Sequence, residues 1–306
     1  MNGFTPRIGI LLATYNGARF LSAQLESFRA QTETGWVLFW RDDGSTDDTV
    51  AQMTAFAAEI GVHRCIRLGG AEHIGASASF FALLAACGSE GLPLAFADQD
   101  DVWLPDKLAW ALEALAPLAG PALYCSRQRL VDEALSPIGD SARLHRAPSF
   151  ANALTQNVAT GCTIVLNPAA ARLVARSRPS SATLHDWWSY LVVTAAGGRV
   201  IADGRPTVLY RQHASNLVGA PASTVSRARA ALRRGPSTYM AILRANVACL
   251  LSQPDVLTVD ARQTLETIDR ALRGPMTARL RALALPGFRR QTPMETALFV
   301  CWFLIG

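Results

Sequence analysis

The sequence predicts an α/β protein with a mostly parallel central sheet, helices on both faces of that sheet, and a helical C-terminal extension. Strand-like apolar runs and helix-like segments alternate four times over about the first hundred residues. Polar clusters directly follow three of these runs, at Thr14–Gly17, Asp42–Ser45 and Asp98–Asp101. Because ligands bind at the carboxyl ends of parallel strands, we expect the three clusters to form one site.

The first four strands are expected where short apolar runs end in polar turns, at residues 8–13, 36–40, 63–68 and 93–97. The helices between them are expected from apolar residues at helical spacing. Leu21, Leu25 and Phe28 mark the first helix, Val50, Met53, Phe56 and Ile60 the second, and Phe80, Phe81, Leu83 and Leu84 the third. The second helix begins with a capping-box-like pattern, in which Ser45 stands three residues before Asp48.

A fourth helix is expected from Pro105, because proline favours the first helical turn and Leu104, Leu108, Leu112 and Leu115 fall on one face. The apolar runs after it predict strands at residues 122–125, 161–166, 199–202 and 207–210, and helices at 169–177 and 185–196. Residues 126–148 are polar and poorly periodic, so no element is predicted there. From Arg227 onward the chain is helical in character.

The 306 residues, half of them hydrophobic, are enough for one large domain or two ordinary domains with a real core. The six cysteines show no paired spacing, which favours reduced thiols in a cytosolic protein and no zinc site. The start of the sequence has neither a basic stretch nor a long apolar region, so we expect no secretion signal. The composition therefore indicates a cytoplasmic globular protein.

The C-terminal part of the chain is its basic part. Residues 221–306 hold 12 arginines against five acidic residues, a net charge of +7, whereas the preceding residues carry −2. The apolar run at 297–305 is shorter than the roughly twenty residues that a membrane span needs. The favoured interpretation is a tail that lies on an anionic membrane surface, and the alternative is packing on the protein or across a homodimer interface. Nucleic-acid binding is disfavoured, because the basic residues lack interleaved aromatics.

The apolar run at 94–97 ends in three carboxylates, Asp98, Asp100 and Asp101. Carboxylates at a strand end bind hard divalent cations, which keep coordination positions free for substrate phosphates. Taken alone, the stretch also suits a solvated acidic loop, and Asp101 is expected to cap the following helix. No Gly-x-Gly-x-x-Gly or P-loop pattern is present, so carboxylates and a metal would hold the phosphates of a nucleotide.

Five stretches in order resemble the family 2 glycosyltransferases of the GT-A fold, and within them the bacterial rhamnosyltransferase-like branch. The resemblance runs from Ile8 to about Gly219, roughly seven tenths of the chain. Its motifs are Ala13-Thr-Tyr-Asn-Gly17, Arg41-Asp-Asp-Gly-Ser-Thr-Asp47, Ala97-Asp-Gln-Asp-Asp-Val-Trp103, His185-Asp-Trp-Trp188 and Tyr210-Arg-Gln-His-Ala-Ser-Asn216. One departure is His73, where similar sequences often have an asparagine that helps to hold the donor.

The resemblance implies a GT-A catalytic domain at residues 1–220, with a nucleotide-sugar-binding part at about 1–125 and an acceptor part at about 126–220, followed by the extension at 221–306. Asp98 and Asp100 would form the Asp-x-Asp motif that binds Mg²⁺ or Mn²⁺. The donor would be bound by side chains from several motifs, namely Thr14, Tyr15, Asn16, Asp43, Asp98, Gln99 and Arg211. Thr14, Tyr15 and Asp43 among them would line the pocket for its nucleotide base.

Three further residues keep two interpretations each. Asp186, beside Trp187 and Trp188, is the catalytic base that the resemblance implies, or the N-cap of the helix that starts there. His213 is a metal or phosphate partner at a strand end, or a structural residue. Arg211 pairs with the diphosphate through its planar guanidinium, or with a surface carboxylate.

The expected activity is a metal-dependent hexosyl transfer, with rhamnose as the sugar that the resemblance indicates. It would run from a nucleotide-diphosphate donor to a glycan or lipid-linked acceptor of the cell envelope. With one carboxylate as base and no second one evident as nucleophile, a single displacement would invert the anomeric configuration. The alternatives are a sugar-nucleotide nucleotidyltransferase and a catalytically inactive sugar-nucleotide-binding protein. If the tail binds lipid, the protein would lie on the inner face of the cell membrane.

Overall fold

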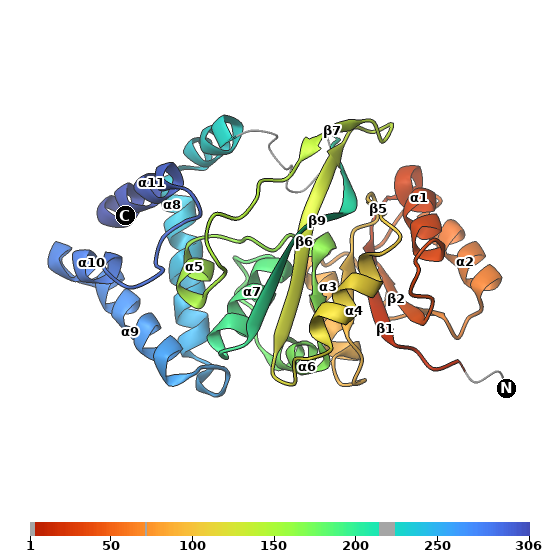
Figure 1. Cartoon of the computed structure of the whole chain (residues 1–306), viewed down its shortest axis with the longest axis horizontal. Coiled ribbons are helices and arrows are strands. Elements are labelled where there is room, and N and C mark those ends of the chain that lie inside the picture. Colours follow the sequence, from red (N-terminus) through yellow and green to blue (C-terminus); the bar gives the residue numbers. More distant parts are fainter. Residues whose placement is uncertain (1–3, 71, 214–223) are drawn as a thin grey trace.

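The computed structural model describes residues 4–70, 72–213 and 224–306 (Figure 1). Its strands are β1 (Ile8–Thr14), β2 (Trp36–Asp42), β3 (Cys65–Arg67), β4 (Leu94–Ala97), β5 (Val102–Trp103), β6 (Ala122–Val131), β7 (Pro137–Asp140), β8 (Val165–Leu166) and β9 (Arg199–Arg211). Its helices are α1 (Ala18–Arg29), α2 (Thr49–Ile60), α3 (Ala76–Cys87), α4 (Lys107–Leu115), α5 (Phe150–Thr155), α6 (Pro168–Arg176), α7 (His185–Ala195), α8 (Thr224–Leu251), α9 (Val259–Arg273), α10 (Met276–Leu283) and α11 (Pro293–Ile305).

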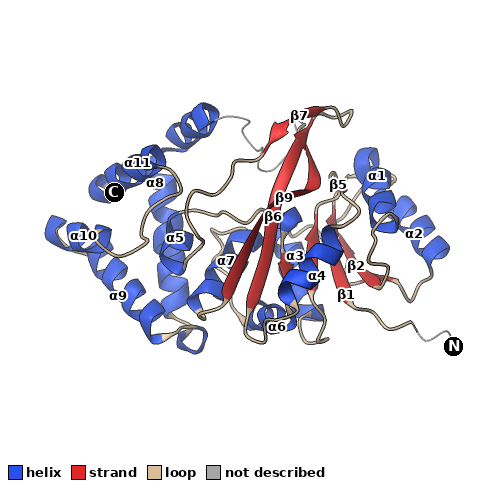
Figure 2. Ribbon diagram, viewed as in Figure 1, coloured by secondary structure: helices blue, strands red, loops and turns tan. Residues whose placement is uncertain are grey.

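The strands form one sheet in the order β3-β2-β1-β4-β8-β6-β9-β5, with β7 beside β6 (Figure 2). The ladders β3-β2-β1-β4 and β6-β9 are parallel, and they include the longest pairings of the sheet. β8 is antiparallel to both of its neighbours, so the two parallel groups on either side of it run in the same direction. The prediction of a mostly parallel sheet is confirmed.

Helices cover both faces of this sheet, as predicted, and β1 shows why. Ile8, Ile10 and Leu12 of β1 pack with residues of α1, α2 and α4, while Leu11 packs on the opposite face with residues of α3, α6 and α7. Successive side chains of a strand point to opposite faces, so an unbroken apolar strand requires cover on both. The two hydrophobic cores lie on the two sides of the sheet.

The middle of the chain departs from the prediction. Residues 126–131 continue β6, and residues 137–140 form β7, although neither stretch has a clear apolar period. β6 pairs with β9 along its whole length, so partner strands determine the structure there. The two strands predicted at 199–202 and 207–210 are a single strand, β9, with a register shift near Arg127. The strand predicted at 161–166 is a 3₁₀ turn, Gly161–Thr163, followed by the short β8.

The C-terminal extension is helical, as predicted, and lies at the end of the molecule opposite β1–β3 (Figure 1). Its apolar end is largely buried: Phe299, Trp302 and Phe303 are at most 6% exposed and share one core with α5 and α7. Burial against the catalytic part is the alternative that the sequence left open for this segment. The predicted boundary near residue 220 lies outside the described residues. Within the ranges described, none of the helices combines the length and the apolar character that crossing a bilayer requires.

Candidate active site

The three polar clusters meet at the carboxyl ends of β1, β2 and β4. Thr14 is buried, and its Oγ1 donates to Oδ1 of Asp42 at 3.0 Å. Oδ1 of Asn16 accepts a 2.8 Å hydrogen bond from the amide of Thr46. The fold therefore brings the clusters together. Hydrogen bonds of their side chains hold the turns against one another.

Gln99 joins the acidic loop after β4 to the turn after β1. Its Oε1 accepts from the amide of Tyr15 at 2.8 Å, and its Nε2 donates to the Tyr15 carbonyl at 2.9 Å. The side-chain amide group of Gln99 lies directly over Gly17. A Cβ atom at position 17 would lie 2.1 Å from Oε1 of Gln99. A glycine at position 17 therefore makes this close approach possible.

Asp43 is held in place by the protein itself. Its carboxylate accepts hydrogen bonds from the guanidinium of Arg41 and from the amides of Ile74 and Gly75, at 2.6–2.8 Å. Burial alone would raise the pKa of Asp43, but these hydrogen bonds and one from Ser79 hold it below its usual value. The sequence predicted a contact with the nucleotide base and gave no signal for this structural role, because Ile74 and Gly75 lie more than thirty positions away in the chain.

An aromatic pair lies above this carboxylate. The rings of Tyr15 and His73 have centroids 4.6 Å apart, and Tyr15 is 45% exposed. Nδ1 of His73 lies 3.0 Å from Oδ2 of Asp43. His73, the departure from the family pattern noted above, therefore contacts Tyr15 and Asp43, two of the residues predicted to line the pocket for the nucleotide base.

The acidic loop places like charges close together. Burial, followed by the carboxylates of Asp100 and Asp186, raises the pKa of Asp98 to about 8. Nε2 of His213, at the end of β9, lies 2.8 Å from Oδ2 of Asp100. Crowded carboxylates beside an imidazole offer the donor atoms that suit a hard divalent cation, which would favour the ionised forms of the carboxylates. Among the described residues, however, the potential ligand atoms that lie within 4.8 Å of one another belong to Asp98, Asp101 and Cys162, and not to the predicted set of Asp98, Asp100 and His213.

Asp101 does not cap the following helix, contrary to the prediction. The N-cap position of α4 is Asp106, and Asp101 is buried, accepting a 3.1 Å hydrogen bond from the amide of Arg211. Potential ligand atoms of Asp98, Asp101 and Cys162 lie within 4.8 Å of one another, a grouping that the sequence did not reveal. Burial and then the two carboxylates raise the pKa of the Cys162 thiol well above its usual value, so Cys162 stays protonated and donates to Asp101. Oxygen ligands therefore dominate this grouping.

Arg211 connects β9 to the acidic loop. Its Nε donates to the carbonyl oxygen of Asp100 at 2.8 Å, and its NH1 group donates to the carbonyl oxygen of Glu133. The guanidinium also lies 4.5 Å from the centroid of the Phe20 ring. The surface ion pair considered as its alternative role does not fit a residue that is only 4% exposed.

Asp186 lies in the first turn of α7, whose N-cap position is Leu184. It therefore does not have the N-cap role that was its alternative. Its carboxylate accepts from the amides of Trp187 at 2.6 Å and Gly161 at 3.2 Å, and the side chain of Asn157 also hydrogen-bonds to it. Burial is the main effect on its pKa, which rises to about 6 despite these hydrogen bonds. A carboxylate with such a pKa is mostly ionised at neutral pH and remains basic enough to accept a proton.

The neighbours of Asp186 make its surroundings apolar. His185 stacks on Phe80 with ring centroids 4.0 Å apart, and burial lowers its pKa to about 3, so it is neutral. Trp188 is fully buried, whereas Trp187 is partly exposed and donates from Nε1 to the carbonyl of Ala153 at 2.7 Å. Water is excluded from much of this region, which strengthens electrostatic interactions there.

Known proteins of similar sequence are glycosyltransferases. Residues 10–132 match the family model described as glycosyl transferase family 2. The chain is 28% identical to the dTDP-rhamnosyl transferase RfbG of Shigella flexneri over 68% of this chain and 74% of that protein. A shorter match, 34% identical over 110 residues, is to an uncharacterized glycosyltransferase of Nostoc.

Solved structures share the fold at low sequence identity. TarS of S. aureus superposes with a TM-score of 0.55 and 13% identity over 89% of this chain, which spans 44% of the TarS chain. TarS 1–349 in complex with UDP-GlcNAc gives a TM-score of 0.55 and 12% identity, covering 97% of this chain and 89% of that one. The fold is therefore similar to that of GT-A glycosyltransferases. Residues 10–132 are similar to glycosyl transferase family 2, and the longer match makes the chain similar to a rhamnosyl transferase.

Proposed function

We propose that this protein transfers a sugar from a nucleotide-diphosphate donor to a saccharide acceptor, with inversion at the anomeric carbon and Asp186 as general base. The observation that carries the proposal is the proximity of Asp186 to the acidic loop. Gly161 donates its amide to Asp186, and the sulfur of the next residue, Cys162, lies within 4.8 Å of a carboxylate oxygen of Asp98. A base for the acceptor and a binding site for the donor phosphates then lie in one place. RfbG, named as a dTDP-rhamnosyl transferase, makes rhamnose the first sugar to test.

The donor would lie along the edge formed by β1, β2 and β4. The exposed ring of Tyr15 is available to the nucleotide base, and Thr14, Asn16, Asp43 and Gln99 hold the backbone around it. Asp98, Asp100 and His213 would bind Mg²⁺ or Mn²⁺, which when bound neutralises the leaving diphosphate. Arg211 would keep the acidic loop and the diphosphate together, since it already binds the Asp100 carbonyl.

In the reaction, Asp186 accepts the proton of the acceptor hydroxyl as its oxygen attacks the anomeric carbon. The bond from that carbon to the diphosphate oxygen breaks on the opposite side, and the nucleoside diphosphate leaves with the electron pair. The hydrogen bonds from Gly161 and Trp187 keep the Asp186 carboxylate oriented throughout. One displacement of this kind inverts the configuration.

The test is a panel of dTDP-, UDP- and GDP-sugars, scored for release of the nucleoside diphosphate with Mg²⁺ or Mn²⁺ present. Release from at least one donor, and an inverted product by NMR, is the expected outcome. A nucleotidyltransferase would instead form a sugar nucleotide from a nucleoside triphosphate and a sugar phosphate. An inactive binding protein would bind a panel member without releasing the diphosphate.

A membrane-linked acceptor is consistent with the surface of the extension. Met276 and Leu280 of α10 are about half exposed, and Arg279 of the same helix donates to carbonyls at the end of α11 at 3.0 and 2.9 Å. Exposed apolar side chains on a basic helical segment suit an anionic lipid surface. A lipid-linked saccharide would then reach the site from the inner face of the membrane.

A further inference from the structure

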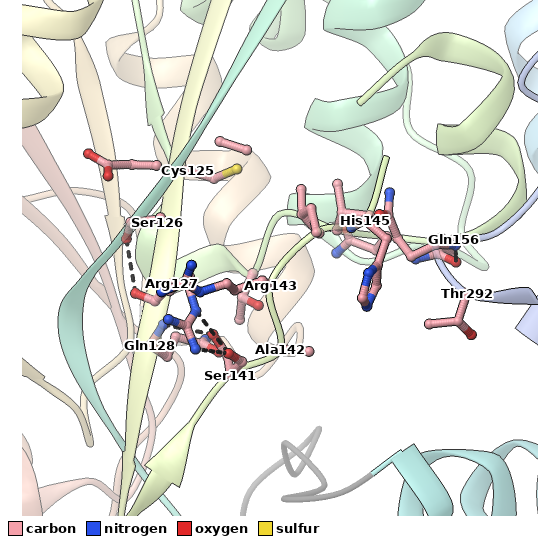
Figure 3. A pocket seen from close by; sticks show the side chains of 18 of the residues that line it. Cys125, Ser126, Arg127, Gln128, Ser141, Ala142, Arg143, His145, Gln156 and Thr292 are labelled. Atoms are coloured by element: carbon pink, nitrogen blue, oxygen red, sulfur yellow. Dashed lines mark hydrogen bonds between the residues drawn. The ribbon is translucent and has the colours of Figure 1, made fainter. Parts of the chain in front are cut away.

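A cavity of about 380 Å³ lies between β6 and the extension (Figure 3). It is lined by five parts of the chain: β6, residues 202–204 of β9, the loop after β7, the segment between α5 and Gly161, and the start of α11. Among the described residues, none of those proposed to bind the donor lines it. This volume is near the lower end of the roughly 300–1,000 Å³ typical of small-molecule sites, a size suited to a small saccharide.

The cavity adjoins the base through the segment before Gly161. Asn157 and Thr160 line the cavity, and the side chain of Asn157 hydrogen-bonds to Asp186. Gly161, next in the chain after Thr160, donates its amide to Oδ2 of Asp186 at 3.2 Å. A molecule in the cavity would therefore contact the segment that orients the base.

The lining is suited to hydroxyl groups. Amide and hydroxyl side chains from four of the five parts face the cavity, including those of Ser126, Gln128, Asn157 and Thr160. Arg143 and His145 contribute from the loop after β7, and Figure 3 shows both beside the open space. Arg143 is exposed, and its guanidinium could donate hydrogen bonds to hydroxyl groups of a ligand.

The extension holds one wall of this cavity in place through Gln291, which is 5% exposed. Oε1 of Gln291 accepts from the amides of His145 at 2.9 Å and Arg146 at 2.8 Å. Its Nε2 donates to the Arg146 carbonyl at 3.2 Å, and its own amide donates to Oε1 of Gln156 at 3.0 Å. Gln291 thus ties the extension to two of the lining parts, to the loop after β7 through its side chain and to Gln156 through its backbone amide.

We propose that this cavity binds the acceptor saccharide, and that Gln291 of the C-terminal extension is a positioning residue that shapes it. The proposal rests on the proposed glycosyl transfer. It assigns the extension a role in recognising the acceptor, whereas charge and apolar pattern had indicated a membrane segment.

The test measures saccharide binding to the full chain without a donor. The probes are p-nitrophenyl glycosides of rhamnose, glucose, galactose and N-acetylglucosamine, titrated by saturation-transfer NMR. At least one probe should bind, and Gln291→Ala should weaken it by about tenfold, the equivalent of roughly 1.4 kcal/mol. Arg143→Ala, at an exposed position where misfolding is not expected, should weaken it by about threefold.

Gln253 supplies a matched control. It is 7% exposed, and its side chain clamps the backbone of Arg178 with hydrogen bonds of 2.6 and 2.8 Å, but it does not line the cavity. Gln253→Ala should lower the thermal midpoint about as much as Gln291→Ala and leave saccharide affinity within about twofold. A purely structural Gln291 would make the two variants behave alike in both measurements.

Two results would overturn the inference: no probe binds the wild-type chain, or the Gln291 and Arg143 variants bind as the wild type does. Either result leaves the proposed function standing if the donor panel shows release of the nucleoside diphosphate. Failure of that release with saccharide binding intact would reject the transferase and keep the cavity as a saccharide site.

Discussion

Nε2 of His213, at the end of β9, lies 2.8 Å from Oδ2 of Asp100, 113 positions earlier in the chain. The two residues were proposed separately as metal ligands, one from an acidic motif and the other as a histidine at a strand end. β5 pairs with β9 and Arg211 donates to the Asp100 carbonyl, so β9 is attached directly to the acidic loop. This connection places an imidazole beside the carboxylate without any local sequence pattern.

The first prediction is that turnover depends on a divalent ion at this pair. Asp100→Ala, or chelation with EDTA, should abolish release of the nucleoside diphosphate. His213→Ala should raise the Mg²⁺ or Mn²⁺ concentration for half-maximal activity by about tenfold or more. A metal titration of each variant measures this, with His63→Ala as a histidine control. Turnover that persists unchanged in EDTA would rule out the metal site.

The second prediction concerns the pH dependence that Asp186 would impose. A general base must be ionised, and burial raises the pKa of Asp186 to about 6. kcat/KM for transfer should therefore be level above this pH and fall about tenfold for each pH unit below it. Gly161 and Trp187 donate to different oxygens of Asp186, so Asp186→Asn keeps an acceptor for one of the two amides. The donor phosphates would bind at the acidic loop, so donor affinity should survive while transfer falls by about a hundredfold or more.

Folding of Asp186→Asn is checked by its thermal midpoint. Near-wild-type transfer by a folded variant would show that another group takes the proton. A product that retains the anomeric configuration of the donor would contradict the single displacement.

The third prediction separates stability from catalysis at Asp43. Asp43→Ala leaves the buried guanidinium of Arg41 without its carboxylate and should lower the free energy of unfolding by about 3–5 kcal/mol. Because hydrogen bonds lower the folded-state pKa of Asp43, its contribution is present above about pH 4 and is lost as pH falls through that lowered value. Urea denaturation at pH 7 and pH 3 measures both effects.

The exposed Asp48 is the matched control, since Asp48→Ala should change stability by no more than about 0.5 kcal/mol. If Asp43→Ala lowered donor affinity without lowering stability, the Asp43 carboxylate would bind the donor and would not be needed to hold the loop.

The fourth prediction tests the contact between Gly17 and Gln99. A methyl group at position 17 would displace the Gln99 amide and break its two hydrogen bonds to the Tyr15 backbone. Gly17→Ala should therefore weaken sugar-nucleotide binding by about tenfold. Gln99→Ala removes the clash, so adding Gly17→Ala to it should have little further effect. Additive losses in this double-mutant cycle would show that the two positions act independently.

Prediction of the fold from the sequence was most successful for elements whose structure is determined by residues close together in the chain. β1, β2 and β4 are unbroken apolar runs buried on both faces, and the Asp-x-Asp motif follows one of them directly. β7 and the second half of β6 were missed because polar residues there are ordered by pairing with β9 and with each other. α5 has only six residues, too few to show a helical period.

For the site, the sequence motifs predicted which residues are present, whereas their hydrogen-bond partners are determined by the fold. The amide of Gly161 and the side chain of Asn157 reach Asp186 across 25 or more positions, so no spacing rule could join them. Composition alone could not decide between the two interpretations of the extension. An apolar run with basic neighbours has the composition of a membrane segment, and only packing shows that Phe299 and Phe303 are covered by the protein itself.

The last prediction concerns membrane binding by the extension, and the burial of α11 determines its design. Deleting residues after 286 would expose the core that Phe288, Phe299 and Phe303 fill, so lost vesicle binding could be a result of unfolding. Substitutions on α10 avoid this, because Met276 and Leu280 are 51% and 54% exposed. With Met276→Glu and Leu280→Glu combined, co-sedimentation with anionic vesicles at low salt should fall by about tenfold, while nucleotide release stays unchanged. Val259→Glu adds one such charge at a residue of α9 that is 71% exposed, and it should lower vesicle binding by much less than half of that effect. If the wild-type chain does not co-sediment with such vesicles, the extension has a packing role within the protein and does not bind membranes.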